Sequence, residues 1–399
     1  MKSCASPPEM MPLADDTDPT HWIRRALTAV LGVPLAAQDM ADLDSQGSLG
    51  LYFHRGKDGH GKKSKEVMGI TNKHVVSRSL HADYEYGGQQ SPRKQYLRNC
   101  GYRRFGQLLE ETRALLGVKL NQATRFAAQL AKLLESRPQE EDARYNLNVK
   151  YKEQDLQRVE SDVRILSDFL RLIQSTWSDP LDRIIAWVDW APKVANDADL
   201  RRYTRDIAVM TLEKDKFVKN FKGNFVYLAG KFTPDQIIAC FHPNVANPPV
   251  FEYPLDHLFR LSGCVDAAGL STPYFLDDDN KPCFIVAKDG QKTDLTFGRQ
   301  SELEALTCPD LEGHSWEVAI LNYGGREHGD FSAGGDSGSA IFNAEGKLVA
   351  LLHSYLPTGS STHMTFGTPG HYVMELVMQR YPDADFSRSQ YDDDDATSV

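Results

Sequence analysis

The sequence predicts a mainly β protein that is interrupted by one long helical block. Short strand-like segments that contain glycine fill residues 46–86, and a strongly helical stretch of about 95 residues follows them. From "RDIAVMTL" onward, short apolar runs again alternate with turn signals. The 399 residues are 41% hydrophobic and 25% charged, which is typical of a globular chain with a sizeable core.

The charge and the cysteines exclude several classes of function. A net charge of −10, part of it in the tail "DDDDATSV", disfavours nucleic-acid binding and gives no electrostatic basis for membrane binding. The longest apolar run near the start, residues 26–37, is too short to span a bilayer and predicts a buried helix. Six scattered cysteines without a CxxC pair argue against a zinc site and a dense disulfide framework. We expect no metal or other cofactor and a cytoplasmic location.

The helical block carries two apolar stripes that predict a helical hairpin. One stripe runs from Phe105 to Leu133, and the other repeats at intervals of four and three residues from Leu156 to Trp177. The segment "ESRPQEED" breaks the pattern between them. Two interpretations remain open: the helices pack on each other, or the hairpin is a surface that recognises a protein partner.

The stretch "FSAGGDSGSAIF", residues 331–342, has the composition of a turn that presents a nucleophile. Gly334, Gly335 and Gly338 surround the hydroxyl of Ser337, and glycine is used where the backbone needs unusual angles or close approach. A plain hairpin turn between two strands has the same composition. The stretch therefore indicates catalysis only if partners for Ser337 exist elsewhere in the chain.

A serine hydroxyl needs a base, and histidine has a suitable pKa. Of the 12 histidines, His74 in "MGITNKHVVS" opens the turn after an apolar strand that ends at Thr71. A buried acid should orient the imidazole, and Asp206 in "RRYTRDIAVMTL" precedes another apolar strand. Asp197 and Asp199 are the competing acids, although their context "ANDADLRRY" better suits the start of a short helix.

These segments resemble those of trypsin-like serine peptidases of the chymotrypsin fold. "GDSGSAIF" matches the Gly-Asp-Ser-Gly motif of that family residue by residue, and the chain order His, Asp, Ser is the chymotrypsin order. The last 70 residues are similar to glutamyl endopeptidases and their fungal relatives. The resemblance covers about residues 46–90 and 200–382, and leaves the helical block outside. It implies two six-stranded antiparallel barrels with the active site in the cleft between them.

This resemblance gives an expected division of the chain. Residues 1–45 are expected to be an N-terminal extension. The first barrel is expected in residues 46–250 and to contain the helical insertion 101–195. Residues 251–382 are expected to form the second barrel and a C-terminal helix, and residues 383–399 an acidic disordered tail.

The resemblance also implies a function, that of a serine endopeptidase acting on peptides or proteins. His74, Asp206 and Ser337 are the predicted catalytic residues, and the N–H groups of Gly335 and Ser337 are predicted to bind the oxyanion. The alternative is a catalytically idle binding module with the same fold that uses the helical hairpin to recognise a partner.

The aspartate beside the nucleophile needs a partner of its own. In trypsin-type enzymes a freed amino terminus pairs with this aspartate, but no basic residue immediately precedes the corresponding strand start "SQGSLGLYF". A buried unpaired carboxylate is costly, so we expect an internal Arg, Lys or hydrogen-bond donor to pair with Asp336.

Substrate preference is predicted from the segment "GKLVALLHSYLP", which resembles the strand that walls the primary specificity pocket. His353 and Ser354 on this strand, with Ser332, are the predicted substrate-binding residues. Because Phe331 offers no charge for Lys or Arg, the pocket is expected to prefer Glu, Asp or Gln before the scissile bond. The alternative interpretation of His353, a histidine packed in the barrel wall, remains open.

Overall fold

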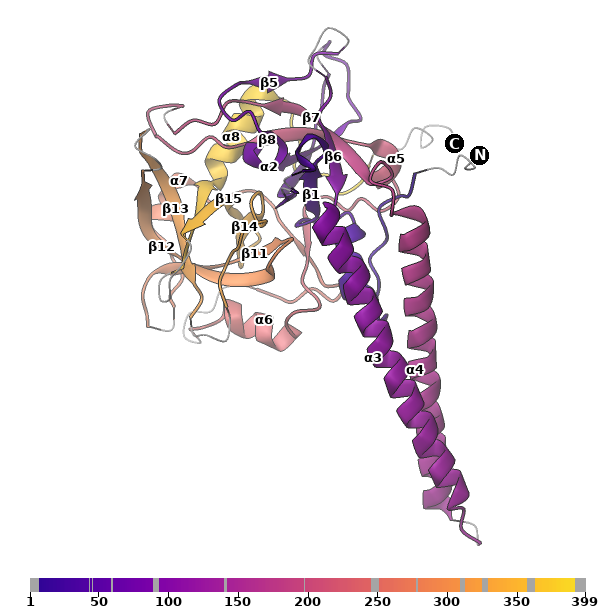
Figure 1. Ribbon diagram of the computed structural model, residues 1–399. Helices are drawn as coiled ribbons and strands as arrows, with labels where there is room; N and C mark the ends of the chain where they lie inside the picture. Colours follow the sequence, from indigo (N-terminus) through magenta and orange to yellow (C-terminus); the bar gives the residue numbers. More distant parts are fainter. Residues whose placement is uncertain are drawn as a thin grey trace, which may run out of the picture.

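A computed structural model of the chain (Figure 1) describes residues 7–42, 44, 46–58, 60–88, 93–139, 142–196, 198–244, 251–277, 279–308, 313–324, 329–356 and 363–391. It contains a half-barrel, a closed six-stranded barrel and a long helical hairpin. The predicted fold class, mainly β with two antiparallel barrels and an inserted helical hairpin, is confirmed, except that the first of the two expected six-stranded barrels is a half-barrel.

The first half is one antiparallel sheet. Its strands are β1 (Pro34–Ala37), β2 (Gly47–Ser48), β3 (Leu51–His54), β4 (Val67–Thr71), β5 (Tyr84–Glu85), β6 (Tyr96–Asn99), β7 (Ile184–Ala191) and β8 (Ala208–Leu212). They lie in the order β2-β1-β6-β7-β8-β4-β3, with β5 on β7. Strands β2 and β3 are the two edges of the sheet, and in the described residues they do not pair with each other. This half is therefore a half-barrel that does not close.

The second half is a closed barrel, as predicted. Its strands are β11 (Cys283–Gly290), β12 (Asp294–Thr307), β13 (Ser315–Asn322), β14 (Ala340–Asn343), β15 (Leu348–Leu356) and β16 (Met364–Pro369). The order is β11-β12-β13-β16-β15-β14, and β14 closes the ring on β11. Apolar side chains from β11, β13, β14 and β15 fill the interior. A separate two-stranded sheet joins β9 (Phe225–Tyr227) to β10 (Leu258–Arg260).

Two long helices dominate the helical part. The helices are α1 (His21–Arg24), α2 (Lys73–Val76), α3 (Tyr102–Glu135), α4 (Ala143–Thr176), α5 (Lys214–Phe217), α6 (Pro234–Phe241), α7 (Ala267–Ser271) and α8 (Gly370–Arg380), with the 3₁₀ turns η1 (Arg25–Leu27) and η2 (Gln38–Met40). Helices α3 and α4 have 34 residues each and form a hairpin that projects from the barrels (Figure 1). The Asp142 carboxylate caps α4 by accepting the N–H groups of Arg144 and Tyr145.

The buried residues of the hairpin lie toward its base. They are Phe105, Leu108 and Thr112 of α3, and Val159, Leu166, Phe169 and Ile173 of α4. Phe105, Leu108, Phe169 and Ile173 belong to the main hydrophobic core of the protein. Toward the tip, Leu134 and Leu147 are about half exposed. The two stripes therefore pack the helices together and anchor the base in the core.

Two of the expected segments contribute strands to the sheet of the first half. Helix α4 ends at Thr176, and the remainder of the range 101–195 contains β7, which lies between β6 and β8. Strand β1, within residues 1–45, pairs with β6. The chain therefore uses these segments as part of its sheet. The buried helix expected at residues 26–37 is wrong, because a short apolar run suits a buried strand as well as a helix.

The expected acidic tail begins later than residue 383. Residues 383–391 cross the first half and pair there: the His54 N–H donates to the Asp385 carbonyl at 2.8 Å, and the Asp385 N–H returns the bond at 2.9 Å. The Asn224 amide donates to the carbonyl of Phe386, and Tyr391 packs on Phe221. Aromatic residues between the acids give this segment apolar surface to bury. Residues 392–399 lie outside the described part of the chain.

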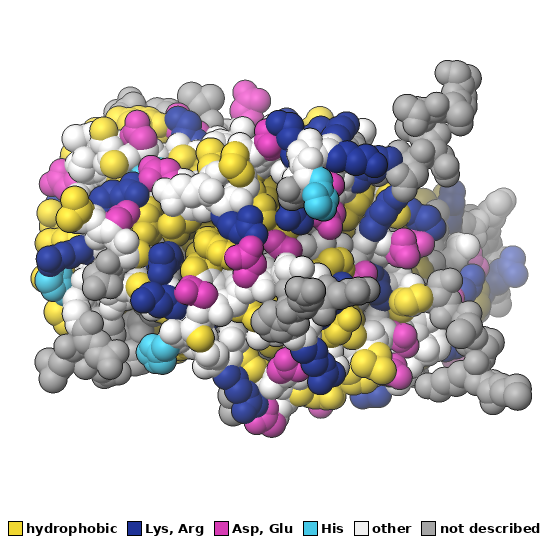
Figure 2. All heavy atoms as spheres, turned by 90° about the horizontal axis from the view of Figure 1, so that it is seen from above, with side chains coloured by type: hydrophobic (Ala, Val, Ile, Leu, Met, Phe, Trp, Pro, Cys, Tyr) yellow, Lys and Arg dark blue, Asp and Glu magenta, His cyan; other side chains and the backbone are white. Residues whose placement is uncertain are grey.

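The surface carries charges of both signs. On the face in Figure 2, Lys and Arg side chains are interspersed with Asp and Glu. Among the described residues, no helix is long and apolar enough to cross a membrane.

Shortening the hairpin tests how far it supports the fold. Removal of residues 123–156, with the cut helices joined by four glycines, should leave a cooperatively folded protein, because the core residues of the hairpin lie nearer its base. Four residues span about 13 Å, enough to join helix axes that are about 8–10 Å apart. Thermal unfolding should show a midpoint within a few degrees of the full chain.

A longer deletion provides the contrast. Removal of residues 104–174 takes away Leu108 and Ile173, and truncation of one such core residue costs about 2–5 kcal/mol. This variant should lose cooperative unfolding. An insoluble product from the short deletion would show instead that the tip supports the fold.

Candidate active site

The Ser337 turn leads into β14, at the junction of the two halves. Gly335 and Gly338 have φ angles of +116° and +89°, which residues with a side chain rarely adopt. A β carbon at Gly338 would lie 2.2 Å from Oγ1 of Thr71, the last residue of β4. The Gly338 N–H donates to the carbonyl of Leu352 on β15 at 2.8 Å. Glycine is thus required here both by the backbone angle and by the close approach of the first half.

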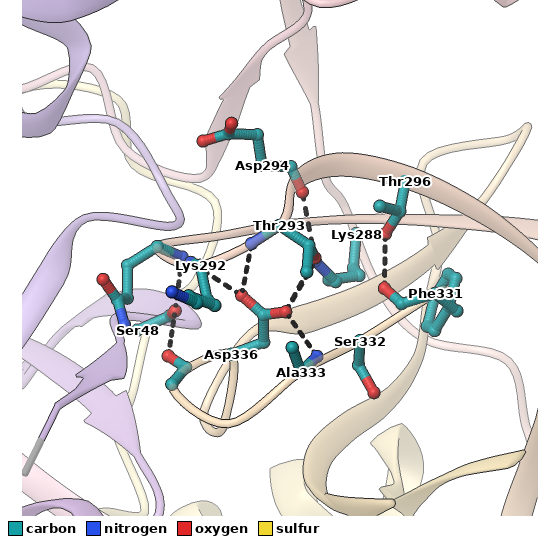
Figure 3. Close-up of polar contacts among 12 residues, drawn as sticks. Ser48, Lys288, Lys292, Thr293, Asp294, Thr296, Phe331, Ser332, Ala333 and Asp336 are labelled. Atoms are coloured by element: carbon teal, nitrogen blue, oxygen red, sulfur yellow. Dashed lines mark hydrogen bonds and ion pairs between the residues drawn. The ribbon is translucent and has the colours of Figure 1, made fainter. Parts of the chain in front are cut away.

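Asp336 is fully buried beneath this turn and is held on several sides (Figure 3). Its carboxylate lies 3.2 Å from Nζ of Lys288, a side chain that is also fully buried. It accepts the N–H groups of Lys292, Thr293 and Ala333 at 2.9–3.1 Å and the Thr293 hydroxyl at 2.7 Å. The expected internal partner for Asp336 is confirmed, and it is Lys288.

These contacts decide the ionisation of Asp336. Burial alone would raise the pKa of this carboxyl, but the Lys288 charge and the hydrogen bonds outweigh burial and hold the pKa below its ordinary value. Asp336 therefore stays ionised at neutral pH. Because the folded-state pKa is depressed, its contribution to stability is present above the unfolded pKa of about 4 and is lost as the pH falls through the folded value.

His74 and Asp206 are in direct contact. Nδ1 of His74 lies 2.5 Å from Oδ2 of Asp206, and the His74 backbone N–H donates to Oδ1 at 3.2 Å. Asn72 donates its side-chain amide to the Asp206 carbonyl at 2.7 Å. The Asp206 side chain is buried, whereas that of His74 is about one-third exposed. The arrangement fixes the imidazole with Nε2 as its free nitrogen.

The charge of Asp206 is stabilised by the same contact. Burial acts to raise the pKa of Asp206, but the His74 side chain and its hydrogen bonds outweigh burial, so the pKa lies below its ordinary value. Of the competing acids, Asp199 is paired with Arg201, and Asp197 lies outside the described residues. Asp206 is the acid that the structure brings to His74.

The turn that carries His74 also lies close to Ser337. A β carbon at Gly47 would come within 2.4 Å of Val75, the neighbour of His74, and within 2.8 Å of the Ser337 carbonyl. The Ser48 N–H donates to the same carbonyl at 2.8 Å. The backbone of residues 47 and 48 therefore lies directly between the turn that carries Ser337 and the turn that carries His74, in contact with both.

The polar groups of the Ser337 turn are only partly engaged. The Ser337 hydroxyl donates to the carbonyl of His353 at 3.4 Å, and among the described residues no hydrogen bond joins it to His74. The N–H groups of Gly335 and Ser337 have no acceptor in the described part of the chain. Two backbone donors are thus left available beside the serine.

The predicted substrate-binding residues fall into two groups. Nε2 of His353 lies 2.8 Å from Oε2 of Glu317, a buried residue of β13 that also accepts the Thr204 hydroxyl. Burial acts to lower the pKa of His353, but Glu317 outweighs it and raises that pKa. Ser354 follows His353 on β15, next to a bulge in the pairing with β16.

Ser332 belongs to the second group. Its hydroxyl lies 2.6 Å from that of Thr365 and 3.4 Å from Nε2 of His363, whose pKa burial lowers. The His363 ring stacks on Tyr355, with centroids 5.5 Å apart. No contact joins Ser332 to His353 in the described residues. His363 was not predicted. It lies immediately before β16, with Nε2 3.3 Å from the Thr365 hydroxyl.

Comparison with solved structures finds serine proteases. One is a glutamic-acid-specific serine protease, described as using a novel histidine triad in substrate binding, at 9% identity and a TM-score of 0.38; the match covers 90% of this chain and 99% of that one. A Nocardiopsis protease matches at 8% identity and a TM-score of 0.35, with 90% and 99% covered. Thermobifida fusca protease A matches at 9% identity and a TM-score of 0.35, with 90% and 97% covered. No model of a protein family and no curated protein matches the chain. Similarity this distant says nothing about activity.

The Lys288–Asp336 ion pair gives a prediction for stability. Lys288→Met leaves a buried carboxylate without its cation, which costs about 3–5 kcal/mol in free energy of unfolding. Denaturant unfolding at pH 7 should show this loss, and adding Asp336→Asn to the same protein should recover a large part of it.

Lys281→Met is the matched control, because Lys281 is an exposed lysine of the same half of the protein. It should unfold like the parent protein. If Lys288→Met is as stable as Lys281→Met, the ion pair does not hold the turn.

Proposed function

We propose that the protein is a serine endopeptidase whose nucleophile is Ser337. The observation that carries this proposal is the contact between His74 and Asp206 next to the Ser337 turn. A buried, ionised carboxylate on Nδ1 is the arrangement that makes Nε2 of a histidine a base for a nearby hydroxyl. The idle binding module is the less supported alternative, because it gives no reason for this contact.

The chemistry follows from these groups. His74 accepts the Ser337 proton at Nε2 as Oγ attacks a peptide carbonyl, and the N–H groups of Gly335 and Ser337 stabilise the oxyanion. His74 then donates its proton to the leaving amine, and an acyl-enzyme remains. Water, deprotonated by His74, attacks the ester and releases the acid product. Asp206 stays ionised and stabilises the imidazolium in both steps.

The first attack requires the Ser337 hydroxyl to leave the His353 carbonyl. A bond of 3.4 Å is at the long limit for a hydroxyl donor and is weak. Rotation of χ1 between staggered positions redirects Oγ without moving the backbone. Catalytic hydrogen bonds commonly tighten only when substrate is bound.

A fluorophosphonate probe tests this proposal directly, because it reacts with an activated serine and not with an idle one. The full-length protein should be labelled at Ser337, as located by mass spectrometry, and should hydrolyse peptides. Ser337→Ala should abolish both while leaving the unfolding transition unchanged. Undiminished hydrolysis in this variant would remove Ser337 from the mechanism.

Asp206→Asn tests whether the reactivity of Ser337 depends on His74 and Asp206 or has another cause. It should lower kcat by about 10³ to 10⁴, because the amide favours the wrong tautomer of His74. Asp199→Asn, in the exposed pair with Arg201, is the matched control and should keep full turnover. The opposite result would mean that Asp206 is not the orienting acid.

We also propose that the substrate side chain before the scissile bond binds beside Ser332 and that Glu, Asp or Gln is preferred there. Hydrogen-bond donors gather there, in the hydroxyl groups of Ser332 and Thr365 and the ring of His363. Phe331 is buried and brings no negative charge for Lys or Arg. His353 does not contact Ser332, but it lies on β15, which pairs with β16, and we propose that it adds a positive charge held by Glu317. Its Nδ1 has no hydrogen-bond partner among the described residues.

His353→Gln tests the part of this preference that depends on charge. The glutamine amide still donates to Glu317, but the positive charge is lost. We expect kcat/KM for cleavage after Glu to fall about 10- to 100-fold relative to cleavage after Gln, the scale of a lost charge-assisted hydrogen bond. His81→Ala, at an exposed position, is the control. A peptide-library profile dominated by Lys, Arg or large apolar residues would contradict the preference.

A further inference from the structure

An open groove of about 400 Å³ lies at the base of the hairpin. Its lining comes from three parts of the chain: Trp22 and Arg25 of the N-terminal segment, Gln107 and Glu110 of α3, and Gln291 and Lys292 of the turn between β11 and β12. None of these side chains has a role in the chemistry described above.

Two residues of the groove wall, Gln291 and Lys292, contact the turn that carries Ser337, and Figure 3 shows the contact of Lys292 with Asp336. The Gln291 N–H donates to the Ser48 hydroxyl at 3.0 Å, and that hydroxyl donates to the Gly335 carbonyl at 3.4 Å. Nε2 of Gln291 lies 2.2 Å from the position that a β carbon on Gly335 would occupy. The Lys292 N–H binds Asp336 at 2.9 Å. The wall of the groove is therefore in contact with the residues that precede Ser337.

The groove wall and the side chains around Ser332 contact the turn through different residues. The Ser332 hydroxyl lies against Thr365 of β16, whereas the groove wall reaches the turn through Ser48 and Gln291. Ser48 also carries the N–H that binds the Ser337 carbonyl. Ser48 therefore contacts both the groove wall, through Gln291, and the Ser337 carbonyl.

Most charges in the groove are already paired. Arg25 binds Asp289 and Asp294 and lies 4.2 Å from the ring centre of Trp22, and Arg104 lies 3.3 Å from Glu111. These contacts hold the walls in place. Lys292 and Glu110 are exposed, and in the described part of the chain their charges have no partner. Of the two, Lys292 belongs to the turn that contacts Asp336.

We propose that this groove binds the substrate segment that follows the scissile bond, with α3 as its outer wall. Lys292 pairs there with a carboxylate side chain among the first residues of the leaving segment. The inserted hairpin thereby takes part in substrate recognition through its base. This inference rests on the proposed peptidase function and adds a second determinant of specificity to it.

Two peptides test the role of Lys292. They are identical up to the scissile bond and carry either Asp or Lys at the second position after it. The full-length protein should show a higher kcat/KM for the Asp peptide, by about 2- to 5-fold, which is the scale of one exposed ion pair. Lys292→Glu should invert the ratio, and Lys292→Gln should bring it near one. Because each variant is judged by its kcat/KM for the Asp peptide divided by that for the Lys peptide, a general change in activity does not affect the result.

Lys281→Glu is the matched control, because it makes the same change of net charge at an exposed lysine that does not line the groove. It should keep the parent ratio. An unchanged ratio in Lys292→Glu, or equal shifts in both variants, would overturn the inference.

A bulky substitution tests the wall that α3 provides. Gln107→Trp should lower kcat/KM at least 10-fold for peptides with three or more residues after the scissile bond, relative to an activated ester that has none. Gln129→Trp, on the exposed outer part of the same helix, should leave this ratio unchanged. Equal ratios in the two variants would show that peptides do not enter the groove.

The ester separates the two proposals. If the parent protein hydrolyses the ester and is labelled by the fluorophosphonate, but its peptide hydrolysis relative to the ester depends on neither Lys292 nor Gln107, the groove inference is overturned and the peptidase is kept. Loss of all hydrolysis and labelling in the parent protein would overturn the peptidase and the groove inference together.

Discussion

The buried pair of Lys288 and Asp336 is the interaction on which the candidate site depends. Both side chains are fully buried, so neither charge is tolerable without the other. The pair holds the carboxylate under the Ser337 turn, and the backbone N–H groups of the β11–β12 turn add to it. In the family that the sequence resembles, a freed amino terminus has this role. A lysine supplied by the barrel itself means that shaping of this turn requires no cleavage of the chain.

The backbone of the Ser337 turn packs closely against the backbone of the first half. Gly338 lies against Thr71 of the first half, and Gly47 lies between Val75 and the Ser337 carbonyl. Side chains at these glycines would push the halves apart and separate His74 from Ser337. The Arg25 side chain adds a further tie, because it anchors the N-terminal segment to Asp289 and Asp294 of the second barrel. The geometry of the site is thus a property of how the two halves pack.

The sequence predicted most of the fold because its signals are local. Apolar runs bounded by glycine indicate strands, and the spacing from Leu156 to Trp177 indicates a long helix. The contact of His74 with Asp206 joins residues 132 positions apart, and it was predicted through family resemblance. Glu317 and Lys288 were missed because a lone charged residue on a strand gives no sign of what it will face. His363 was missed because its contact with Ser332 joins segments that are 31 positions apart. The packing of residues 383–391 was missed because the acidic composition of the tail was given more weight than the aromatic side chains that lie between its acidic residues.

The rate at which a fluorophosphonate labels Ser337 in the parent protein and in His74→Ala tests the central claim most directly. The comparison isolates the effect of the base on the serine and depends on no substrate. If His74 activates Ser337, the variant should fold like the parent and label about 10² to 10⁴-fold more slowly, the scale of lost general-base catalysis. Equal labelling rates in the two proteins would contradict the claim that His74, oriented by Asp206, activates this serine.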